Sequence, residues 1–310
     1  MLLDVERAVK VIRTPDPDAF VRATEEAKTL ERCRHKHIVD LKDIIAETFH
    51  GERVACIVME YLRNGSAQRL MEKTFVSVRE ACTIIAESLF GLEHAHNQAV
   101  PIIHRDVKPS NILLANEGHA KLSDFGLAIE YYGPALPEGY KTHLAPEVIS
   151  GQTQDTVSDI YSVGVTLFRL LNNQQELTFP FSSPQEHFKA VSRELFPERR
   201  YLPHVPQRVI KVTNKAMRAT RNRRFPHCQE MRQALERLQF FIDWRAGAKD
   251  RWIGQDRDDE YQVYVTKKRS GYEVCFQKNR RRQTKNCSEF SNEAEAYGRM
   301  YSLIESTTIS

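Results

Sequence analysis

The chain has 310 residues, of which 41% are hydrophobic and 28% are charged. This apolar fraction can fill a substantial core, which excludes a wholly disordered chain, and the length suits one large or two ordinary domains. The 45 Lys and Arg exceed the 41 Asp and Glu by four, an excess too small to indicate a partner by itself. No stretch approaches the ~18 uninterrupted apolar residues of a membrane span, and the start of the chain lacks the apolar centre of a signal peptide.

The six cysteines are scattered along the chain and form no CxxC pair. This spacing favours reduced thiols, and it supports neither a disulfide framework nor a zinc module. We therefore expect a globular, cytoplasmic protein without a membrane anchor.

The first sixty residues are expected to form a small β-rich lobe with one helix. β-branched and apolar runs predict strands over 7–12, 38–48 and 54–59. Residues 18–34 carry apolar side chains at helical spacing, and Asp16 or Asp18 is available as the N-cap of that helix.

Helical patterns dominate the larger part that follows. Apolar residues recur at helical spacing over 77–98, 155–172, 184–194, 206–219 and 226–244. A strand-rich insert is expected between Ile102 and Ala128.

The composition changes again after Trp244. Residues 246–260 are polar and charged, which predicts a linker or an exposed arm. Two alternating strands, a third strand and a helix are then expected over 261–266, 272–277, 281–287 and 292–305. Ser291 or Asn292 would begin the helix, and the whole would form a separate small domain.

The most informative stretch runs from His104 to Leu114 and reads HRDVKPSNILL. The triplets DFG at 124–126 and APE at 145–147 follow it, and AVK at 8–10 precedes it inside an expected strand. These four motifs, in this order and at these distances, resemble the signatures of the eukaryotic-type (Hanks-type) serine/threonine protein kinases. The resemblance covers roughly residues 5–242.

The resemblance implies a two-lobed α+β protein-kinase fold. The small lobe and hinge would occupy 1–62 and the helical lobe 63–245. A basic β/α module would follow over 246–310. The implied activity is transfer of the ATP γ-phosphate to a protein serine or threonine, with Mg²⁺ as the cofactor.

Four residues carry the implied chemistry. Asp106 matches the aspartate that accepts or orients the substrate hydroxyl, and Lys108 can reach the transferred phosphate. Asn111 and Asp124 match the two Mg²⁺ ligands, whose oxygens suit a hard cation. Lys108 followed by Pro109 resembles serine/threonine kinases rather than tyrosine kinases.

The nucleotide-binding residues follow by the same matching. Lys10 matches the lysine that holds the α- and β-phosphates, and its expected partner is Glu26, with Glu25 as the alternative. Met59 would be the gatekeeper. The hinge would be Glu60, Tyr61 and Leu62, and the adenine ring would lie between Ala8 and Leu113.

Three residues are expected to brace the large lobe. Asp159 resembles the aspartate that anchors the catalytic loop from a central helix. Glu147 would pair with Arg224 in a structural salt bridge.

Two features depart from the family pattern. No glycine precedes Lys10, so the family's Gly-rich phosphate loop is missing, either because the chain is truncated or because the protein works without it. The segment before the APE triplet reads GYKTHL, with Tyr140 and His143 where the family usually has threonine and tyrosine. The second departure predicts an unusual substrate-docking surface.

Arg105 indicates a basic pocket that a phosphorylated residue of this segment could fill. The candidates are Thr142, Tyr140, Tyr132 and Tyr131. As an alternative, Arg105 only braces the segment.

The C-terminal module is basic. Between 266 and 286, eight Lys and Arg stand against Glu273 alone, interleaved with Tyr272 and Phe276. This pattern suits a nucleic-acid backbone, and the strands followed by a helix faintly resemble the AP2-type DNA-binding sheet. A solvated hairpin or a protein-docking module is the alternative.

A pseudokinase is the rival to the enzyme. Such a scaffold or sensor would bind nucleotide or partner proteins without phosphoryl transfer. The enzyme is favoured because Lys10, Asp106, Lys108, Asn111 and Asp124 are all in place.

Overall fold

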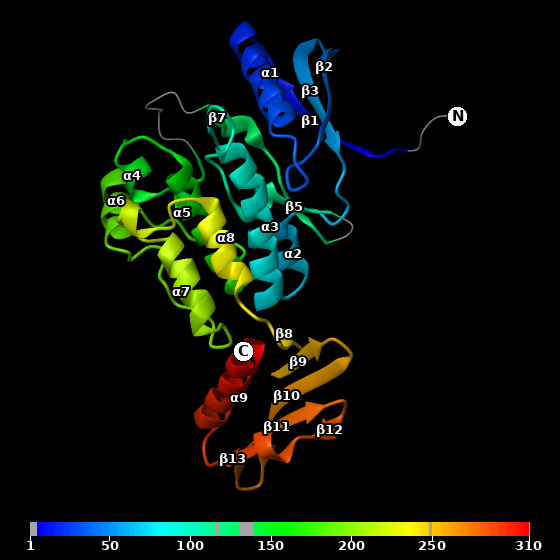
Figure 1. Ribbon diagram of the computed structural model, residues 1–310, viewed down its shortest axis with the longest axis vertical. Coiled ribbons are helices and arrows are strands. Elements are labelled where there is room, and N and C mark those ends of the chain that lie inside the picture. Colours follow the sequence, from blue (N-terminus) through cyan, green and yellow to red (C-terminus); the bar gives the residue numbers. More distant parts are fainter. Residues whose placement is uncertain (1–4, 116–117, 131–138, 248–249, 310) are drawn as a thin grey trace.

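The computed structural model describes residues 5–115, 118–130, 139–247 and 250–309. Figure 1 shows three parts along the long axis: a small β-rich lobe, a helical lobe, and a C-terminal sheet packed against one helix. Within the described residues, no helix combines the length and the apolar character needed to cross a bilayer.

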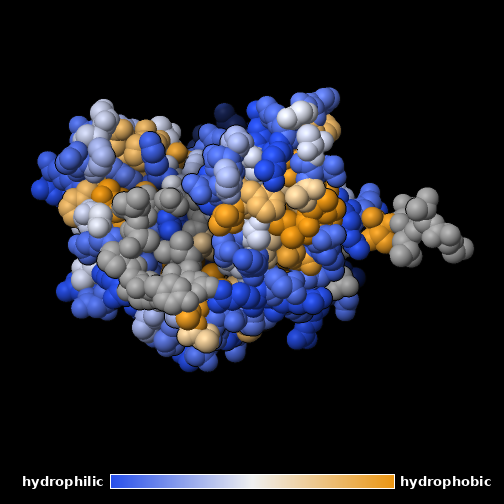
Figure 2. Space-filling model, turned by 90° about the horizontal axis from the view of Figure 1, so that it is seen from above, coloured by the Kyte–Doolittle hydropathy of each residue, from blue (hydrophilic) through white to orange (hydrophobic). Residues whose placement is uncertain are grey.

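The small lobe is a three-stranded antiparallel sheet covered on one face by a helix. Its elements are β1 (Arg7–Arg13), α1 (Pro17–Arg32), β2 (Leu41–Phe49) and β3 (Glu52–Glu60), with β3 in the middle of the sheet. Asp16 caps α1 by accepting a hydrogen bond from the Ala19 amide, so the earlier of the two cap candidates is used. Lys10 pairs with Ile57 across the sheet and faces α1, whereas Val11 points to the opposite face and is exposed. Seen from above, towards the small lobe, the surface carries an apolar patch (Figure 2).

The helical lobe contains the five helices that the sequence predicts and two that it does not. Its helices are α2 (Ala67–Lys73), α3 (Val78–His96), α4 (Pro146–Ile149), α5 (Thr156–Leu171), α6 (Pro184–Ser192), α7 (Gln207–Ala216) and α8 (Cys228–Glu236). Two short antiparallel sheets pair β4 (Ile102–Ile103) with β7 (Ile129–Glu130) and β5 (Ile112–Leu114) with β6 (Ala120–Leu122). The unexpected helices are α2, which Ser66 caps, and the short α4.

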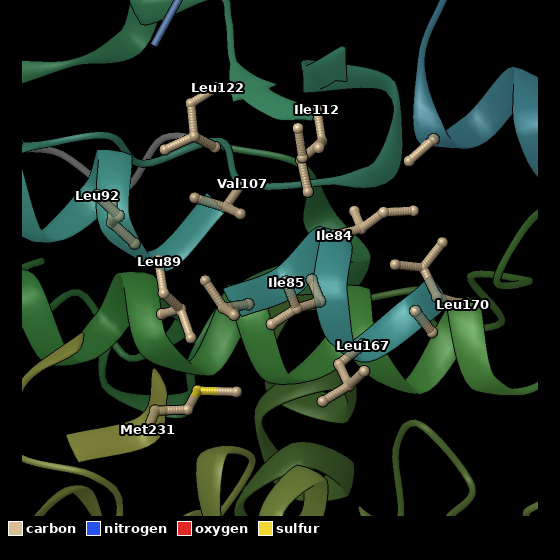
Figure 3. Packing of buried hydrophobic residues seen from close by; sticks show 14 of the residues in the cluster. Ile84, Ile85, Leu89, Leu92, Val107, Ile112, Leu122, Leu167, Leu170 and Met231 are labelled. Atoms are coloured by element: carbon tan, nitrogen blue, oxygen red, sulfur yellow. The ribbon is translucent and has the colours of Figure 1, made fainter. Parts of the chain in front are cut away.

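The main core lies around α3 and α5. Leu89 and Leu92 of α3 and Leu167 and Leu170 of α5 are fully buried, and Figure 3 shows these side chains packed together with Met231 of α8. A capping box at Asp155 and Ser158 begins α5. Because every residue from Val157 to Leu171 is buried, α5 is a rigid central support for the loops around it.

The C-terminal unit is a six-stranded antiparallel sheet with its own core. Its elements are β8 (Asp243–Ala246), β9 (Arg251–Asp256), β10 (Asp259–Lys268), β11 (Gly271–Lys278), β12 (Arg281–Arg282), β13 (Ser288–Phe290) and α9 (Glu293–Thr308), the last capped by Asn292. Trp244, Val263 and Phe276 of the sheet pack with Met300 and Ile304 of α9.

Three expectations for this region are wrong. The helix expected over 226–244 ends at Glu236, and the chain then enters β8, so the expected boundary at 245/246 falls inside a strand. The linker expected over 246–260 is instead β9 and the start of β10. Its charged residues lie on the exposed side and in the turn, while Trp252 and Gly254 face the core. The third strand expected over 281–287 is interrupted by a 3-10 turn and forms β12 and β13.

Aromatic packing joins the C-terminal unit to the helical lobe. The ring of Phe75 meets Trp252 edge-on at 5.2 Å, and His204 lies 4.7 Å from Trp252 between ring centroids. Arg245 Nη1 of β8 also lies 3.0 Å from Glu80 Oε2 of α3. The unit is therefore docked by specific contacts.

This interface is expected to weaken in acid. Burial lowers the pKa of His204 to about 4, below the ordinary value of about 6.5. The unfolded chain therefore binds the proton more tightly, and stability present above pH ~6.5 is lost as the pH falls towards ~4, by up to about 3 kcal/mol. Denaturant midpoints measured from pH 7 to pH 4 test this. His204→Phe should flatten the profile and His50→Gln, in an exposed turn, should not; equal profiles for all three proteins would contradict the prediction.

Candidate active site

A lysine and two carboxylates from three elements meet between the lobes. Lys10 Nζ of β1 donates hydrogen bonds to Glu26 Oε1 of α1 (2.8 Å) and to Asp124 Oδ1 (2.7 Å), which is 114 residues away in sequence. Glu26 is on the buried face of α1, whereas Glu25 is exposed and pairs with Lys28. Because Glu26 and not Glu25 lies on the buried face of α1, Glu26 is the partner of Lys10.

The three charges influence one another. Burial alone would lower the pKa of Lys10, but its hydrogen bonds to Asp124 and Glu26 and their negative charges raise it. Burial would raise the pKa of Asp124, but the lysine lowers it. For Glu26, burial is stronger than the opposing effect of Lys10 and raises the pKa. The lysine is held as a cation whose charge both carboxylates share.

Gly126 leaves room for this cluster. A Cβ at that position would lie 3.0 Å from Glu26 Oε2 and 3.1 Å from Lys10 Nζ, so a side chain would press directly on the ion pair. Before it, Asp124 has a left-handed backbone (φ 61°), and the buried Phe125 packs against His104 at 4.6 Å between ring centroids. This packing fixes the Asp124 carboxylate towards the cleft.

Among the described residues, only one of the two carboxylate oxygens of Asp106 accepts hydrogen bonds. Its Oδ2 accepts from Lys108 Nζ (2.6 Å) and from Asn111 Nδ2 (2.9 Å). Its Oδ1 is buried and has no hydrogen-bond partner among the described residues. A buried carboxylate oxygen without a partner is costly unless another group supplies the proton, so Oδ1 is free to accept one.

The loop that carries Asp106 is held by a carboxylate from α5. Asp159 is fully buried; its Oδ2 accepts from the His104 amide (2.8 Å) and from His96 Nε2 (2.9 Å), and its Oδ1 accepts from the Arg105 amide (2.9 Å). Arg105 itself has a left-handed backbone (φ 69°), a strained conformation that these bonds stabilise.

Asn111 and Asp124 fit a magnesium ion. The amide nitrogen of Asn111 donates to Asp106, which orients its carbonyl oxygen away from that residue. The Asp124 side chain is 42% exposed towards the cleft. No cluster of three or more His, Cys, Asp or Glu suited to a metal occurs among the described residues. Two oxygen ligands are what Mg²⁺ takes when phosphates complete its shell.

The cleft contains a cavity of 540 Å³ whose wall includes Lys10, Glu26, Asp106 and Asp124. Arg13 of β1 and Arg22 of α1 also line it, and the sequence reasoning did not identify them. The signal for Arg22 was its place one helical turn before Glu26, which puts both on one face of α1.

The expected adenine contacts lie apart from this cavity, towards the hinge. Ala8 of β1 stands opposite Met59 of β3, and Leu113 is on β5. The side chain of Glu60 turns away to Lys121 Nζ (2.6 Å) and the Asp40 amide (2.8 Å), and its amide donates to the Asp40 carbonyl (3.0 Å). Leu62 closes the hinge turn, where its carbonyl accepts from the Gly65 amide at 3.1 Å.

The segment before the APE triplet packs against the catalytic loop. Tyr140 is 40% exposed, whereas Thr142 is buried with its hydroxyl 3.0 Å from His143 Nδ1. Arg105 is buried as well. The other phosphorylation candidates, Tyr131 and Tyr132, lie outside the described residues.

Glu147 and Arg224 form a bidentate buried pair. Arg224 donates to Glu147 Oε1 at 2.6 Å and to Oε2 at 2.7 Å, and its guanidinium lies over the ring of Tyr161. Neither residue lines the cleft cavity, so the pair ties the APE triplet to the lobe.

The comparisons with known proteins agree with this geometry. Residues 4–236 match the family model for the protein kinase domain. The chain is 29% identical over 243 residues to the serine/threonine-protein kinase PrkC of Bacillus subtilis and 31% identical over 245 residues to PknB of Mycolicibacterium smegmatis. Each alignment covers 74% of this chain. The chain belongs to the Hanks-type serine/threonine protein kinase family.

The relatives are much longer proteins. The chain spans 36% of PrkC and 38% of that PknB. The matched part is the kinase domain, and the matching region of the family model ends before β8.

Asp159 is predicted to matter more for stability than other carboxylates of its helix. Asp159→Ala leaves three buried donors without an acceptor and should cost about 3 kcal/mol or more. Asp155→Ala on the same helix removes a cap and should cost about 1 kcal/mol. Urea denaturation of the two variants compares them directly. Equal losses would show that the loop does not depend on the Asp159 carboxylate.

Proposed function

We propose that this protein is a serine/threonine protein kinase that transfers the γ-phosphate of ATP to a protein hydroxyl. The observation that carries the proposal is the unpartnered Oδ1 of Asp106 in a cleft shared with Lys10 and Asp124. A carboxylate oxygen kept free in this way is placed to take a proton from an incoming hydroxyl.

The reaction needs one proton acceptor and one set of cations. The hydroxyl of the acceptor residue gives its proton to Asp106 while its oxygen forms a bond to the γ-phosphorus. The bond between that phosphorus and the β–γ bridging oxygen breaks, and ADP leaves with the electron pair. Lys108, 2.6 Å from Asp106 Oδ2, holds the carboxylate and brings a positive charge beside the transferred group.

The nucleotide is held by the groups around Lys10. The lysine would bind the α- and β-phosphates, and Asn111 and Asp124 would hold Mg²⁺, which neutralises phosphate charge when bound. Ala8, Met59, Leu62 and Leu113 would surround the adenine, with backbone groups of Glu60 and Leu62 as its hydrogen-bond partners.

The serine/threonine preference rests on two supports. Lys108 follows Asp106 by two residues and precedes Pro109, as in kinases of this class. The named relatives are serine/threonine kinases as well. The rival is a pseudokinase. The hydrogen bonds of Lys10 to Glu26 and Asp124 support an enzyme, because they hold the phosphate-binding cation in place before the nucleotide enters.

Incorporation of label from γ-³²P-ATP with Mg²⁺ into a general protein substrate tests the proposal. Asp106→Asn should lower kcat at least ~100-fold because it removes the proton acceptor. Asp124→Asn should abolish labelling because it removes a metal ligand. Asp258→Asn, in an exposed turn of the C-terminal unit, is the matched control and should keep full activity. A wild-type chain without labelling, or equal activity in all variants, would favour the pseudokinase.

We also propose that the C-terminal unit docks the enzyme to a polyanionic partner, of which nucleic acid fits best. Three of its eight clustered cations are neutralised internally: Lys268 and Arg282 contact Glu273, and Lys278 contacts Asp259. The other five are exposed and take part in no ion pair within the described part of the chain; they are Lys267, Arg269, Arg280, Arg281 and Lys285. Lys267 and Arg269 lie at the turn between β10 and β11, and Arg280 and Arg281 lie at the turn between β11 and β12, at the other end of β11.

Salt-dependent binding of duplex DNA or RNA by the full chain tests this role. Replacing Arg280 and Arg281 by Glu should weaken binding and lower the slope of log K against log salt by about two. The charge-matched control replaces Lys36 and Lys211, both exposed on the kinase lobes, by Glu. Absence of binding at low salt would leave docking of a protein as the role of the unit.

A further inference from the structure

The aromatic ring of Tyr140 lies against the side chain of Lys108. The Lys108 ammonium is 5.0 Å from the centroid of that ring. This distance is within the range in which a cation is attracted to the negative face of an aromatic ring. The contact joins the segment before the APE triplet to the loop that carries Asp106.

The Lys108 ammonium has two partners, a carboxylate and an aromatic ring. Its Nζ donates to Asp106 Oδ2 at 2.6 Å, and the Tyr140 ring covers another side of it. Lysine has four rotatable side-chain bonds, so a single hydrogen bond leaves it many alternative positions. A ring on the second side removes much of that freedom.

Tyr140 is itself held in place from both sides. Gly139 has φ 126°, and a Cβ there would lie 2.4 Å from the Arg105 carbonyl oxygen, so the backbone before Tyr140 packs directly on the catalytic loop. On the other side, the ring of the buried His143 lies 5.3 Å from that of Tyr140, and Ser162 of α5 donates to the His143 carbonyl at 2.9 Å. The ring is therefore a fixed support for Lys108.

We propose that Tyr140 is a positioning residue of the phosphoryl-transfer site. Its ring keeps the Lys108 ammonium on Asp106 Oδ2, so that Oδ1 stays open to the acceptor hydroxyl and the cation stays beside the transferred phosphate. This role rests on the proposed function. It belongs to the ring and not to the hydroxyl, which distinguishes it from a role for Tyr140 as a phosphorylation site.

The size of the effect follows from the strength of cation–π contacts, which ranges from about 0.5 kcal/mol when exposed to about 2 kcal/mol when desolvated. Loss of the ring should therefore lower kcat about two- to thirty-fold. The KM for ATP should change less than about two-fold, because the groups expected to bind the adenine, the α- and β-phosphates and Mg²⁺ do not include Lys108.

The kinetic test uses five variants in the full chain: three at Tyr140, Lys108→Ala, and Lys108→Ala combined with Tyr140→Ala. Tyr140→Leu and Tyr140→Ala should lower kcat by the stated factor, and Tyr140→Phe should keep most of it. In a Lys108→Ala background, Tyr140→Ala should have no further effect, because the residue through which the ring acts is gone. A merely structural role would lower kcat in both backgrounds and would overturn the proposal, as would a Phe variant as poor as the Ala variant.

The matched control breaks a similar contact elsewhere. Arg251 lies 4.6 Å from the ring of Tyr264 in the C-terminal sheet. Tyr264→Ala should leave kcat unchanged. Thermal melting and nucleotide binding of every variant show whether the fold is intact.

A second readout is independent of catalysis. Reductive methylation with formaldehyde and cyanoborohydride, followed by mass spectrometry, measures how accessible the Lys108 ammonium is. Tyr140→Ala should label Lys108 at least three-fold faster than wild type, whereas Tyr140→Phe and Tyr264→Ala should not; equal rates in all variants would overturn the proposal. If the wild-type chain transfers no phosphate, the proposed function fails, while the methylation rates still decide whether the ring holds the lysine.

Discussion

The arrangement of the catalytic loop depends on one buried carboxylate. Asp159 projects from α5, whose inner turns are buried on all sides, and binds the amides of His104 and Arg105. A strained left-handed residue such as Arg105 persists only where its surroundings determine it. Because α5 is rigid and Asp159 binds the two residues before Asp106, the position of Asp106 is fixed as well. Lys108 and Asn111 then act on a carboxylate that is already placed.

Charge balance explains how three carboxylates can lie on the wall of one cleft. Its wall carries three carboxylates, Glu26, Asp106 and Asp124, which would repel one another and the phosphates of a nucleotide. Lys10 bonds to two of them and Lys108 to the third. Arg13 and Arg22 add positive charge on the open side of the same cavity. The cleft is thus close to neutral as it stands, and an entering polyanion with its metal finds cations on two sides.

The candidate site residues could be named from the sequence because they occur in short motifs whose local structure is strongly determined. Asp106, Lys108 and Asn111 fall within six consecutive positions, so one loop conformation brings them together. Glu26 was preferred to Glu25 by counting along a helix, and the two differ by 100° around the helix axis, enough to separate a buried position from an exposed one. Arg13 and Arg22 were missed because their role depends on how α1 sits over the sheet, which no motif encodes.

The C-terminal unit was predicted less well for a different physical reason. Its strands bury one face only, so in β9 the buried Trp252 and Gly254 alternate with the exposed Arg251, Ile253 and Gln255. An exposed isoleucine and a buried glycine conceal the apolar period. Gly254 adds to the difficulty: it has no side chain because Ile242 and Trp244 fill the space where its Cβ would lie, a close approach that a sequence cannot reveal. The same one-sided burial leaves the outer face and the hairpin ends free for a partner. Trp252 packs on Phe75 and His204 of the helical lobe. These three rings therefore connect the sheet to which a partner would bind with the lobe that carries the catalytic loop.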